Sequence, residues 1–393
     1  MHMPSGEFRF PPISSVVFGK GSVQRVREKI DEFGAKRALV VTVPPLVAQT
    51  DLVERVKRAL GDKCAGVFSG VVQHVPRQCV IEGTKMAKEV GADILVSLGG
   101  SSPADAAKGI NLVLAEAERI DDFFTSFESQ EVIKATLFKK PKLCQIAIPT
   151  TLSAGEFTEI AGITDPQRKC KDIFRDIKFA PKVIILDPEV TTFTSKELWA
   201  STALKSLSDG FGRACSPEAL PFALALALHA NQMINQHLVS SVREPLDLGA
   251  RAMLQHAVWM NTYSRGPSVL GMVAALRHQI GAVYDVPHGV ASTIVFPHCI
   301  QFNRPLIDEP LVLIAKFWGL PFKNAAGAAE AILKRLGELI QEIGLPTRLR
   351  DVGVPRGGLQ VIADAAMEDP AAQANLKRVN SKEQLIGVLE QAW

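Results

Sequence analysis

In the first half of the chain, short apolar runs alternate with segments in which apolar residues recur every three or four positions. The short runs are typical of buried β-strands, and the recurring pattern is typical of amphipathic helices. The predicted strands are residues 38–42, 64–69, 93–98, 145–149 and 183–187, and the predicted helices are residues 51–60, 81–90 and 104–114. Because strands and helices alternate, we predict an α/β fold with a mostly parallel sheet covered by helices on both faces.

After Asp187-Pro188 the pattern changes, and helical periodicity dominates to the end of the chain. The clearest helical segments are residues 223–238, 247–263 and 325–343. We therefore predict two domains, an α/β domain over residues 1–187 and an all-helical domain over residues 188–393. Within the second domain, Pro297 is expected to place His298 in a turn, because proline disfavours a helix interior.

Composition narrows the classes of function. The chain has 393 residues, of which 47% are hydrophobic, and its formal net charge is +3. The sequence has no basic cluster with interleaved aromatic residues, so no nucleic-acid partner is expected. The longest apolar stretch, residues 220–230, is too short to cross a bilayer, and no apolar leader segment follows Met1. Six cysteines without CxxC spacing are typical of reduced thiols. We expect a cytoplasmic protein without membrane association that acts on a small molecule.

A glycine turn at Gly99-Gly100 follows a predicted strand directly and opens a predicted helix. Glycines let the backbone approach a ligand closely, and the helix N-terminus offers free N–H groups to an anion. The turn therefore predicts a pyrophosphate site, with a plain tight turn as the alternative. A second polar turn over residues 149–156 also follows a strand. Its hydroxyl groups are expected to face a ligand crevice, to cap the next segment, or both.

Four motifs in order along the chain resemble those of the iron-containing alcohol dehydrogenase family, which shares its fold with dehydroquinate synthase and glycerol dehydrogenase. They are Gly99–Lys108, Ile148–Glu156, Ile184–Pro188 and Tyr284–Asn303. The resemblance covers nearly the whole chain, and the maleylacetate reductases are a related branch. It implies a Rossmann-like, dinucleotide-binding N-terminal domain, a helical domain that carries the substrate site, NAD or NADP as the cofactor, and a homodimer or larger homo-oligomer.

The resemblance also assigns cofactor-binding residues by position. It implies that the pyrophosphate is held by Gly99, Gly100, Ser101, Ser102 and Asp105. It further implies that the cofactor is lined by Thr150 and Thr151, with Lys169 or Lys171 nearby.

The residues Thr42-Val43 stand where the family places the cofactor's ribose. Family members often have an aspartate at the position of Val43, where it bonds the ribose 2′-OH and repels a 2′-phosphate. A neutral side chain removes this repulsion. We therefore predict that NADP is tolerated beside NAD, although the cation that would bind the 2′-phosphate is not identified.

The metal site of the family is only partly conserved in this sequence. Family members hold a divalent metal with one aspartate and three histidines. Lys205 stands at the aspartate position, Asp209 and Ala274 stand at two histidine positions, and His288 alone is a matching ligand. His278 matches a further family histidine. An ammonium group at Lys205 cannot ligate a metal without losing its proton. The pattern therefore predicts a degenerate site that holds no metal.

We predict that Lys205 and Asp209 pair at i,i+4 and that the ammonium group replaces the metal as the positive charge next to a carbonyl oxygen. His278 or Lys205 would supply the proton, and His288 completes the predicted catalytic set. The alternative is a structural ion pair in a dead pocket. The predicted function is an NAD(P)-dependent oxidoreductase for a small carbonyl or alcohol. The alternatives are a non-redox lyase or cyclase on the same fold and a non-catalytic nucleotide-binding relic.

Overall fold

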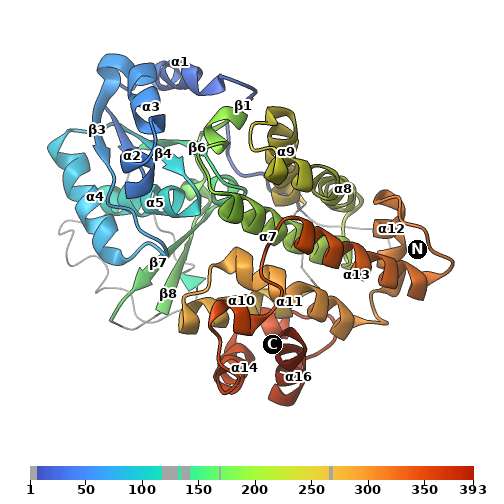
Figure 1. The fold of residues 1–393 in the computed structure, drawn as a ribbon. Helices are drawn as coiled ribbons and strands as arrows, with labels where there is room; N and C mark the ends of the chain where they lie inside the picture. Colours follow the sequence, from blue (N-terminus) through green and yellow to red (C-terminus); the bar gives the residue numbers. More distant parts are fainter. Residues whose placement is uncertain (1–6, 117–131, 134–141, 168–169, 265–268) are drawn as a thin grey trace. The chain divides into compact units, whose positions relative to one another are not determined.

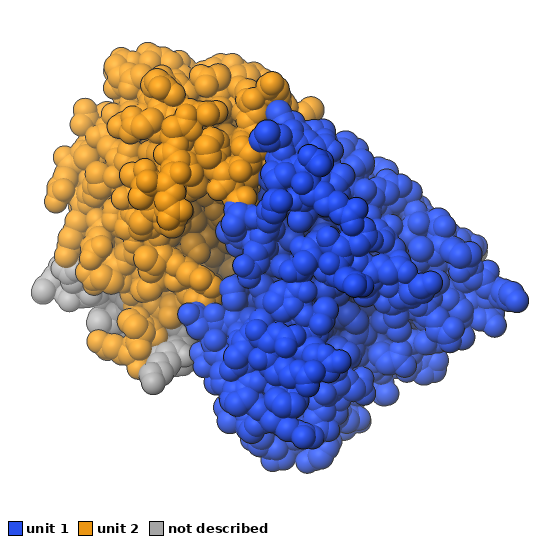
Figure 2. Space-filling model, in the orientation of Figure 1, with its two compact units in different colours: residues 1–5, 195–393 blue, residues 6–194 orange. Residues whose placement is uncertain are grey.

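The computed structural model describes residues 7–116, 132–133, 142–167, 170–264 and 269–393. The chain forms two compact units, and it passes from one to the other between Thr194 and Ser195 (Figure 2). In the part of the chain that the structure describes, no helix is long and apolar enough to cross a membrane.

The N-terminal unit is built on a six-stranded sheet in which every pairing is parallel. Its strands in spatial order are β1 (Ser15–Phe18), β9 (Val183–Leu186), β6 (Cys144–Pro149), β4 (Ile94–Gly99), β2 (Ala38–Val41) and β3 (Cys64–Phe68). The five predicted strands are confirmed within two residues at each end. The edge strand β1 was not predicted.

Helices cover both faces of this sheet, as predicted (Figure 1). Along β2, Ala38 and Val40 pack into one apolar cluster with residues of α1 (Val26–Glu32) and α3 (Leu52–Leu60). The alternate residues Leu39 and Val41 pack into a second cluster with residues of α4 (Arg77–Glu89) and α5 (Ser101–Glu116). Successive side chains of a strand point to opposite faces, so one fully apolar strand contributes to two cores.

Two short helices and a second, smaller sheet complete this unit. The helices are α2 (Pro44–Ala48) and α6 (Pro188–Thr191), and the sheet contains β5 (Val132–Ile133), β8 (Cys170–Arg175) and β7 (Ile160–Asp165) in that order. Strands β7 and β8 pair antiparallel, and β7 also lies against α5. This sheet was not predicted. It matters for the site because it supports α5, which begins at the glycine turn.

Among its described residues, the C-terminal unit consists of helices and the turns that connect them, with no strand. Its α-helices are α7 (Lys196–Ala214), α8 (Pro221–Arg243), α9 (Leu248–Tyr263), α10 (Gly271–Tyr284), α11 (His288–Asn303), α12 (Asp308–Phe317), α13 (Ala325–Glu342), α14 (Gly358–Glu368), α15 (Pro370–Gln373) and α16 (Lys382–Ala392). The prediction for His298 is wrong, because α11 continues through Pro297 and His298 lies inside the helix.

Helix α7 is the central helix of this unit, with α8, α9 and α11 packed around it. Its residue Trp199 is fully buried, and the indole Nε1 donates a hydrogen bond to Ser241 Oγ on α8 at 3.0 Å. At Gly210, a side chain would lie 2.2 Å from Asn261 Oδ1 of α9, so glycine permits this close approach. Packing on several sides fixes the direction in which the polar residues of α7 project.

Candidate active site

The predicted glycine turn is present between a strand and a helix. Strand β4 ends at Gly99, whose φ of +137° is a conformation that residues with side chains rarely adopt. The sixteen-residue helix α5 begins two residues later at Ser101. A side chain at Gly100 would lie 3.0 Å from Thr151 Oγ1, so only glycine fits there without displacing that hydroxyl group. The first free N–H groups of α5 thus follow a narrow glycine turn, which suits a pyrophosphate.

The predicted cofactor residues gather at one edge of the sheet. Apart from Lys169 and Lys171, they follow β2, β4 and β6, which are neighbouring parallel strands. The order of the strands along the chain reverses between β2 and β4, because β3 lies on one side of β2 and the later strands lie on the other. Ligands of open parallel sheets bind outside the carboxyl ends of the strands at such a switch point.

The individual side chains at this edge differ in their burial and in their hydrogen bonds. Thr42 is fully buried, and its hydroxyl group donates to Leu98 O at 2.9 Å, so it joins β2 to β4. Thr151 Oγ1 lies 2.8 Å from Ser153 Oγ. Val43 is partly buried and immediately precedes α2. A direct contact of any of these side chains with a cofactor stays a prediction.

Further along the same edge, Thr150 is buried, and its carbonyl oxygen accepts a hydrogen bond from Thr194 Oγ1 at 2.7 Å. Ser101 and Ser102, in the first turn of α5, are partly exposed. Lys169 lies outside the described residues, whereas Lys171 lies on β8.

Asp105 and Lys108 connect α5, the helix that begins at the glycine turn, to neighbouring segments of the N-terminal unit. Asp105 Oδ2 accepts a hydrogen bond from Gly162 N on β7 at 3.2 Å, and Oδ1 lies 3.5 Å from Lys108 Nζ. The fully buried Lys108 also donates to Gly155 O and Ile160 O, each at 2.7 Å. Burial lowers the pKa of Lys108, while the charge of Asp105 raises it. The Asp105 carboxylate is thus engaged by groups of its own domain, and these contacts favour a positioning role for it.

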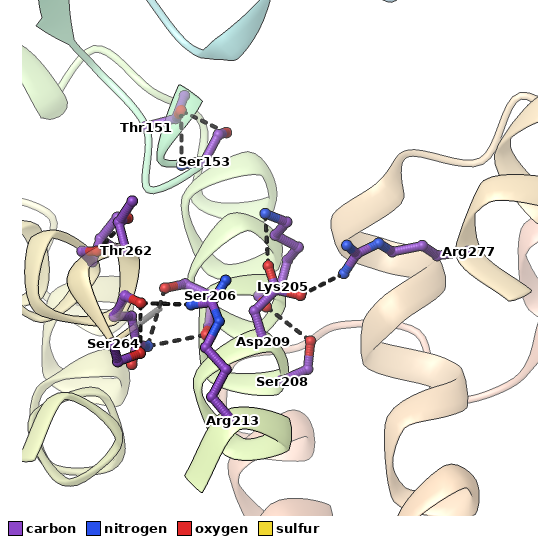
Figure 3. A network of polar contacts seen from close by, with 12 residues as sticks. Thr151, Ser153, Lys205, Ser206, Ser208, Asp209, Arg213, Thr262, Ser264 and Arg277 are labelled. Atoms are coloured by element: carbon purple, nitrogen blue, oxygen red, sulfur yellow. Dashed lines mark hydrogen bonds and ion pairs between the residues drawn. The ribbon is translucent and has the colours of Figure 1, made fainter. Parts of the chain in front are cut away.

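In the helical unit, a cluster of charges surrounds Asp209. Lys205 Nζ lies 2.8 Å from Asp209 Oδ2, so the predicted i,i+4 pair is present (Figure 3). Arg277 on α10 donates to the other carboxylate oxygen, also at 2.8 Å. Burial alone would raise the pKa of Asp209, but Arg277 and Lys205 hold it well below its usual range. The contact with Arg277 was not predicted.

A third cation, Arg213, lies one helical turn beyond Asp209 on α7. Its Nη1 donates to Asn261 O at 2.5 Å, and its charge further lowers the pKa of Asp209. The spacing of Lys205, Asp209 and Arg213 at i, i+4 and i+8 was the signal in the sequence that could have predicted this stripe.

A pocket of about 260 Å³ opens beside this cluster. Its lining residues are Ser208, Asp209, Arg213, Leu270, Gly271, Val273, Ala274, Arg277, Ala371 and Ala374. Asp209 and Ala274 are two of the positions at which the family resemblance implies metal ligands. That these positions have lost their ligands stays a prediction.

The two predicted histidines lie next to each other in this unit. The rings of His278 on α10 and His288 on α11 have centroids 5.7 Å apart and cross at 80°. Nδ1 of His278 lies 2.8 Å from Asp369 Oδ2, and 44% of the His278 side chain is exposed. Burial raises the pKa of Asp369, but the contacts with His278, Ala371 N and Gln279 together lower it below its usual value. A carboxylate partner holds the ring in one orientation, as a positioned proton donor requires. Asp369 was missed because it lies far along the chain.

The side chains of this region do not fit a divalent metal. Among the described residues, no group of three or more His, Cys, Asp or Glu side chains is arranged to hold one. Asp209 already binds two cations. A catalytic metal site ordinarily has three protein ligands. In addition, the positive charges of Lys205 and Arg277 next to Asp209 would repel a divalent ion.

Two family models cover most of the chain. Residues 13–188 match the iron-containing alcohol dehydrogenase model, and residues 199–393 match the C-terminal model of the Fe-containing alcohol dehydrogenase family. The chain is 31% identical to the NAD-dependent methanol dehydrogenase of Bacillus methanolicus, over 98% of this chain and 99% of that protein. It is 28% identical to the maleylacetate reductase of Burkholderia cepacia, over 91% and 90% of the two chains. The solved structure of a 1,3-propanediol oxidoreductase superposes with a TM-score of 0.89 at 26% identity, over 99% of this chain and 100% of the other.

The chain belongs to the iron-containing alcohol dehydrogenase family. The predicted fold class is confirmed, since the six-stranded parallel sheet and the helical C-terminal unit are those of the solved relative. Maleylacetate reductases are among its relatives, beside other alcohol dehydrogenases.

Proposed function

We propose that this protein is an NAD(P)-dependent oxidoreductase that transfers hydride to or from a small carbonyl or alcohol substrate without a metal ion. The observation that carries the proposal is the charge cluster Lys205–Asp209–Arg277 in a chain that keeps the glycine turn. By the family resemblance, Lys205 and Asp209 stand at metal-ligand positions, and Arg277 binds Asp209. The nicotinamide dependence is supported by the name of the Bacillus methanolicus relative. The loss of the metal is supported by the donor set of this site.

A reduced nicotinamide cofactor, which the glycine turn at Gly99 and Gly100 would hold by its pyrophosphate, would supply the hydride that the carbonyl carbon accepts. The π electrons of the C=O bond move onto the oxygen, where Lys205 Nζ stabilises the negative charge. That oxygen then takes a proton from Lys205 or from His278, which Asp369 orients. The products are the alcohol and the oxidised cofactor. Alcohol oxidation runs through the same steps in reverse.

A titration of the purified protein with NADH and NADPH tests this proposal. We expect enhanced nicotinamide fluorescence, substoichiometric bound metal by elemental analysis, and aldehyde reduction that persists after dialysis against EDTA. Absence of nucleotide binding would reject every function that needs the cofactor. Activity that disappears on chelation and returns with Fe²⁺ or Zn²⁺ would reject the metal-independent reaction.

The substitution Val43→Asp is expected to make the protein selective for NAD. A carboxylate at the start of α2 would repel a 2′-phosphate but accept a hydrogen bond from a free 2′-OH. We expect the dissociation constant of NADPH to rise about tenfold or more, with a much smaller change for NADH. Fluorescence titration of both cofactors with both proteins measures this. If the unsubstituted protein uses NAD exclusively, Val43 has no role in cofactor choice.

A further inference from the structure

The pocket beside Asp209 carries more positive than negative charge. Two of its lining residues, Arg213 and Arg277, are cations, and its one acidic lining residue is Asp209. Lys205 adds a third cation that lies against the same carboxylate. The two arginines of the lining and Lys205 thus lie around the one carboxylate of the lining, Asp209. The nearby carboxylate of Asp369 does not line the pocket; it contacts His278 and accepts a hydrogen bond from Gln279.

Arg277 is the cation best placed to bind an anion. Only 13% of its side chain is exposed, so water solvates its charge incompletely. It uses one guanidinium N–H on Asp209 and makes no other hydrogen bond to the described residues. A guanidinium group has five N–H donors in a planar fork, and this fork matches the two oxygens of a carboxylate. An anion in the pocket would satisfy donors that the protein leaves open.

The pocket also has room for such a group. Ala274 lines it from the first turn of α10, about one turn before Arg277 and His278 on the same helix. The small side chain at Ala274 leaves space where the family pattern has a histidine. Apolar lining by Leu270 and Val273 lowers the local dielectric and so strengthens the attraction between an arginine and an anion.

We infer that the substrate is a carbonyl compound, or the matching alcohol, that carries a carboxylate group, and that Arg277 binds this carboxylate with Arg213 beside it. The inference rests on the proposed function, because the carbonyl is the group reduced there. Arg277 is then a specificity-determining residue. Lys205 remains next to the reacting oxygen, while the carboxylate at the other end of the substrate binds the N–H groups of Arg277 that Asp209 does not use.

The first experiment compares two aldehydes that differ in one end group, succinate semialdehyde and butanal. The inference predicts that kcat/KM is higher for succinate semialdehyde by about 10- to 100-fold, the effect of a hydrogen-bonded ionic contact. Equal values, or a preference for butanal, would overturn the inference and leave the proposed oxidoreductase intact. No reduction of either aldehyde, together with no nucleotide binding, would instead reject the proposed function.

A second experiment measures binding without turnover. Isothermal titration of the protein with small carboxylates, from acetate to glutarate, is expected to show binding that butane-1,4-diol does not show and that weakens as the salt concentration rises. If no carboxylate binds, the inference is wrong, whatever the outcome of the turnover assay.

Substitutions at Arg277 and at Ala274 distinguish the effect of the arginine charge from the effect of the pocket volume. Arg277→Met should remove the preference for the carboxylate through a higher KM, and Arg277→Lys should restore part of it. Ala274→Leu keeps every charge but fills the pocket, and it should weaken carboxylate binding as well. The matched control is Arg243→Met, since Arg243 is 60% exposed in a surface pair with Glu342. Retained carboxylate preference in both Arg277→Met and Ala274→Leu would place the anion site elsewhere.

Discussion

Replacing Lys205 by methionine is expected to lower kcat/KM for carbonyl reduction by about 10²- to 10⁴-fold. Methionine has a similar length and no charge, so it removes the ammonium group that lies 2.8 Å from Asp209 and leaves the volume nearly unchanged. Asp209 keeps its contact with Arg277, so the carboxylate is not left without a cation. Steady-state kinetics, together with the dissociation constant of NADH, measure the effect. Cofactor binding should remain as it is because the glycine turn lies in the other unit.

The matched control is Lys334→Met, which removes a lysine from an exposed i,i+4 pair with Glu338 on α13. We expect this variant to turn over at the unsubstituted rate. Unchanged turnover in Lys205→Met would show that Lys205 and Asp209 form a structural ion pair, which is the alternative that the sequence left open.

A third substitution separates the two tasks assigned to Lys205. Lys205→Arg retains a positive charge next to the carbonyl oxygen, but a guanidinium group does not release a proton near neutral pH. If Lys205 only stabilises charge and His278 supplies the proton, the arginine variant should recover most of the activity that methionine loses. If Lys205 itself supplies the proton, both variants should be similarly impaired. The pH profile of kcat identifies the remaining proton donor.

The sequence predicts the central sheet well for a physical reason. Strands buried on both faces are nearly continuous apolar runs, as in β2 and β4, and such runs are recognised without knowing their neighbours. The β7–β8 pair carries charged residues such as Lys171, Asp172 and Arg175. Its pattern is therefore not that of a buried strand. Strand β1 is short and lies at the sheet edge, where few residues carry the signal.

In the candidate site as well, a contact within one helix was predicted from the sequence, whereas a contact between two helices was not. The Lys205–Asp209 pair follows from the spacing of a single helix, so it was predicted and is present. Arg277 lies on another helix, and its contact with Asp209 depends on how α7 and α10 pack. A local pattern does not contain that packing. The turn expected at Pro297 fails for a related reason: α11 packs against α7 and α10, and that burial outweighs the hydrogen bond that proline removes, a penalty of about 3 kcal/mol.

The substitution Lys108→Met is expected to reduce the free energy of unfolding by about 3–5 kcal/mol, the range measured when one partner of a buried ion pair is removed. Lys108 is fully buried and donates to Gly155 O and Ile160 O, each at 2.7 Å. Methionine would leave these carbonyl groups without that donor and Asp105 without its cation. Methionine also removes the free-energy cost of burying a charged ammonium group, and this gain opposes the loss. Burial lowers the pKa of Lys108, which indicates that burying its charge is costly. The former partners of the ammonium group nevertheless remain in the protein interior without their donor, so we expect a net loss of stability.

Urea denaturation measures this effect, and Lys57→Met on α3 of the same unit is the control, since Lys57 is 41% exposed in its pair with Glu54. The control should unfold at the same urea concentration as the unsubstituted protein. Since Lys108 ties α5 to the segment after Thr151, NADH binding should also weaken in Lys108→Met at urea concentrations where the protein is still folded. A folded Lys108→Met variant with unchanged stability and unchanged NADH binding would show that the glycine turn is held by its own backbone. In that case the buried lysine would have no role in forming the phosphate site.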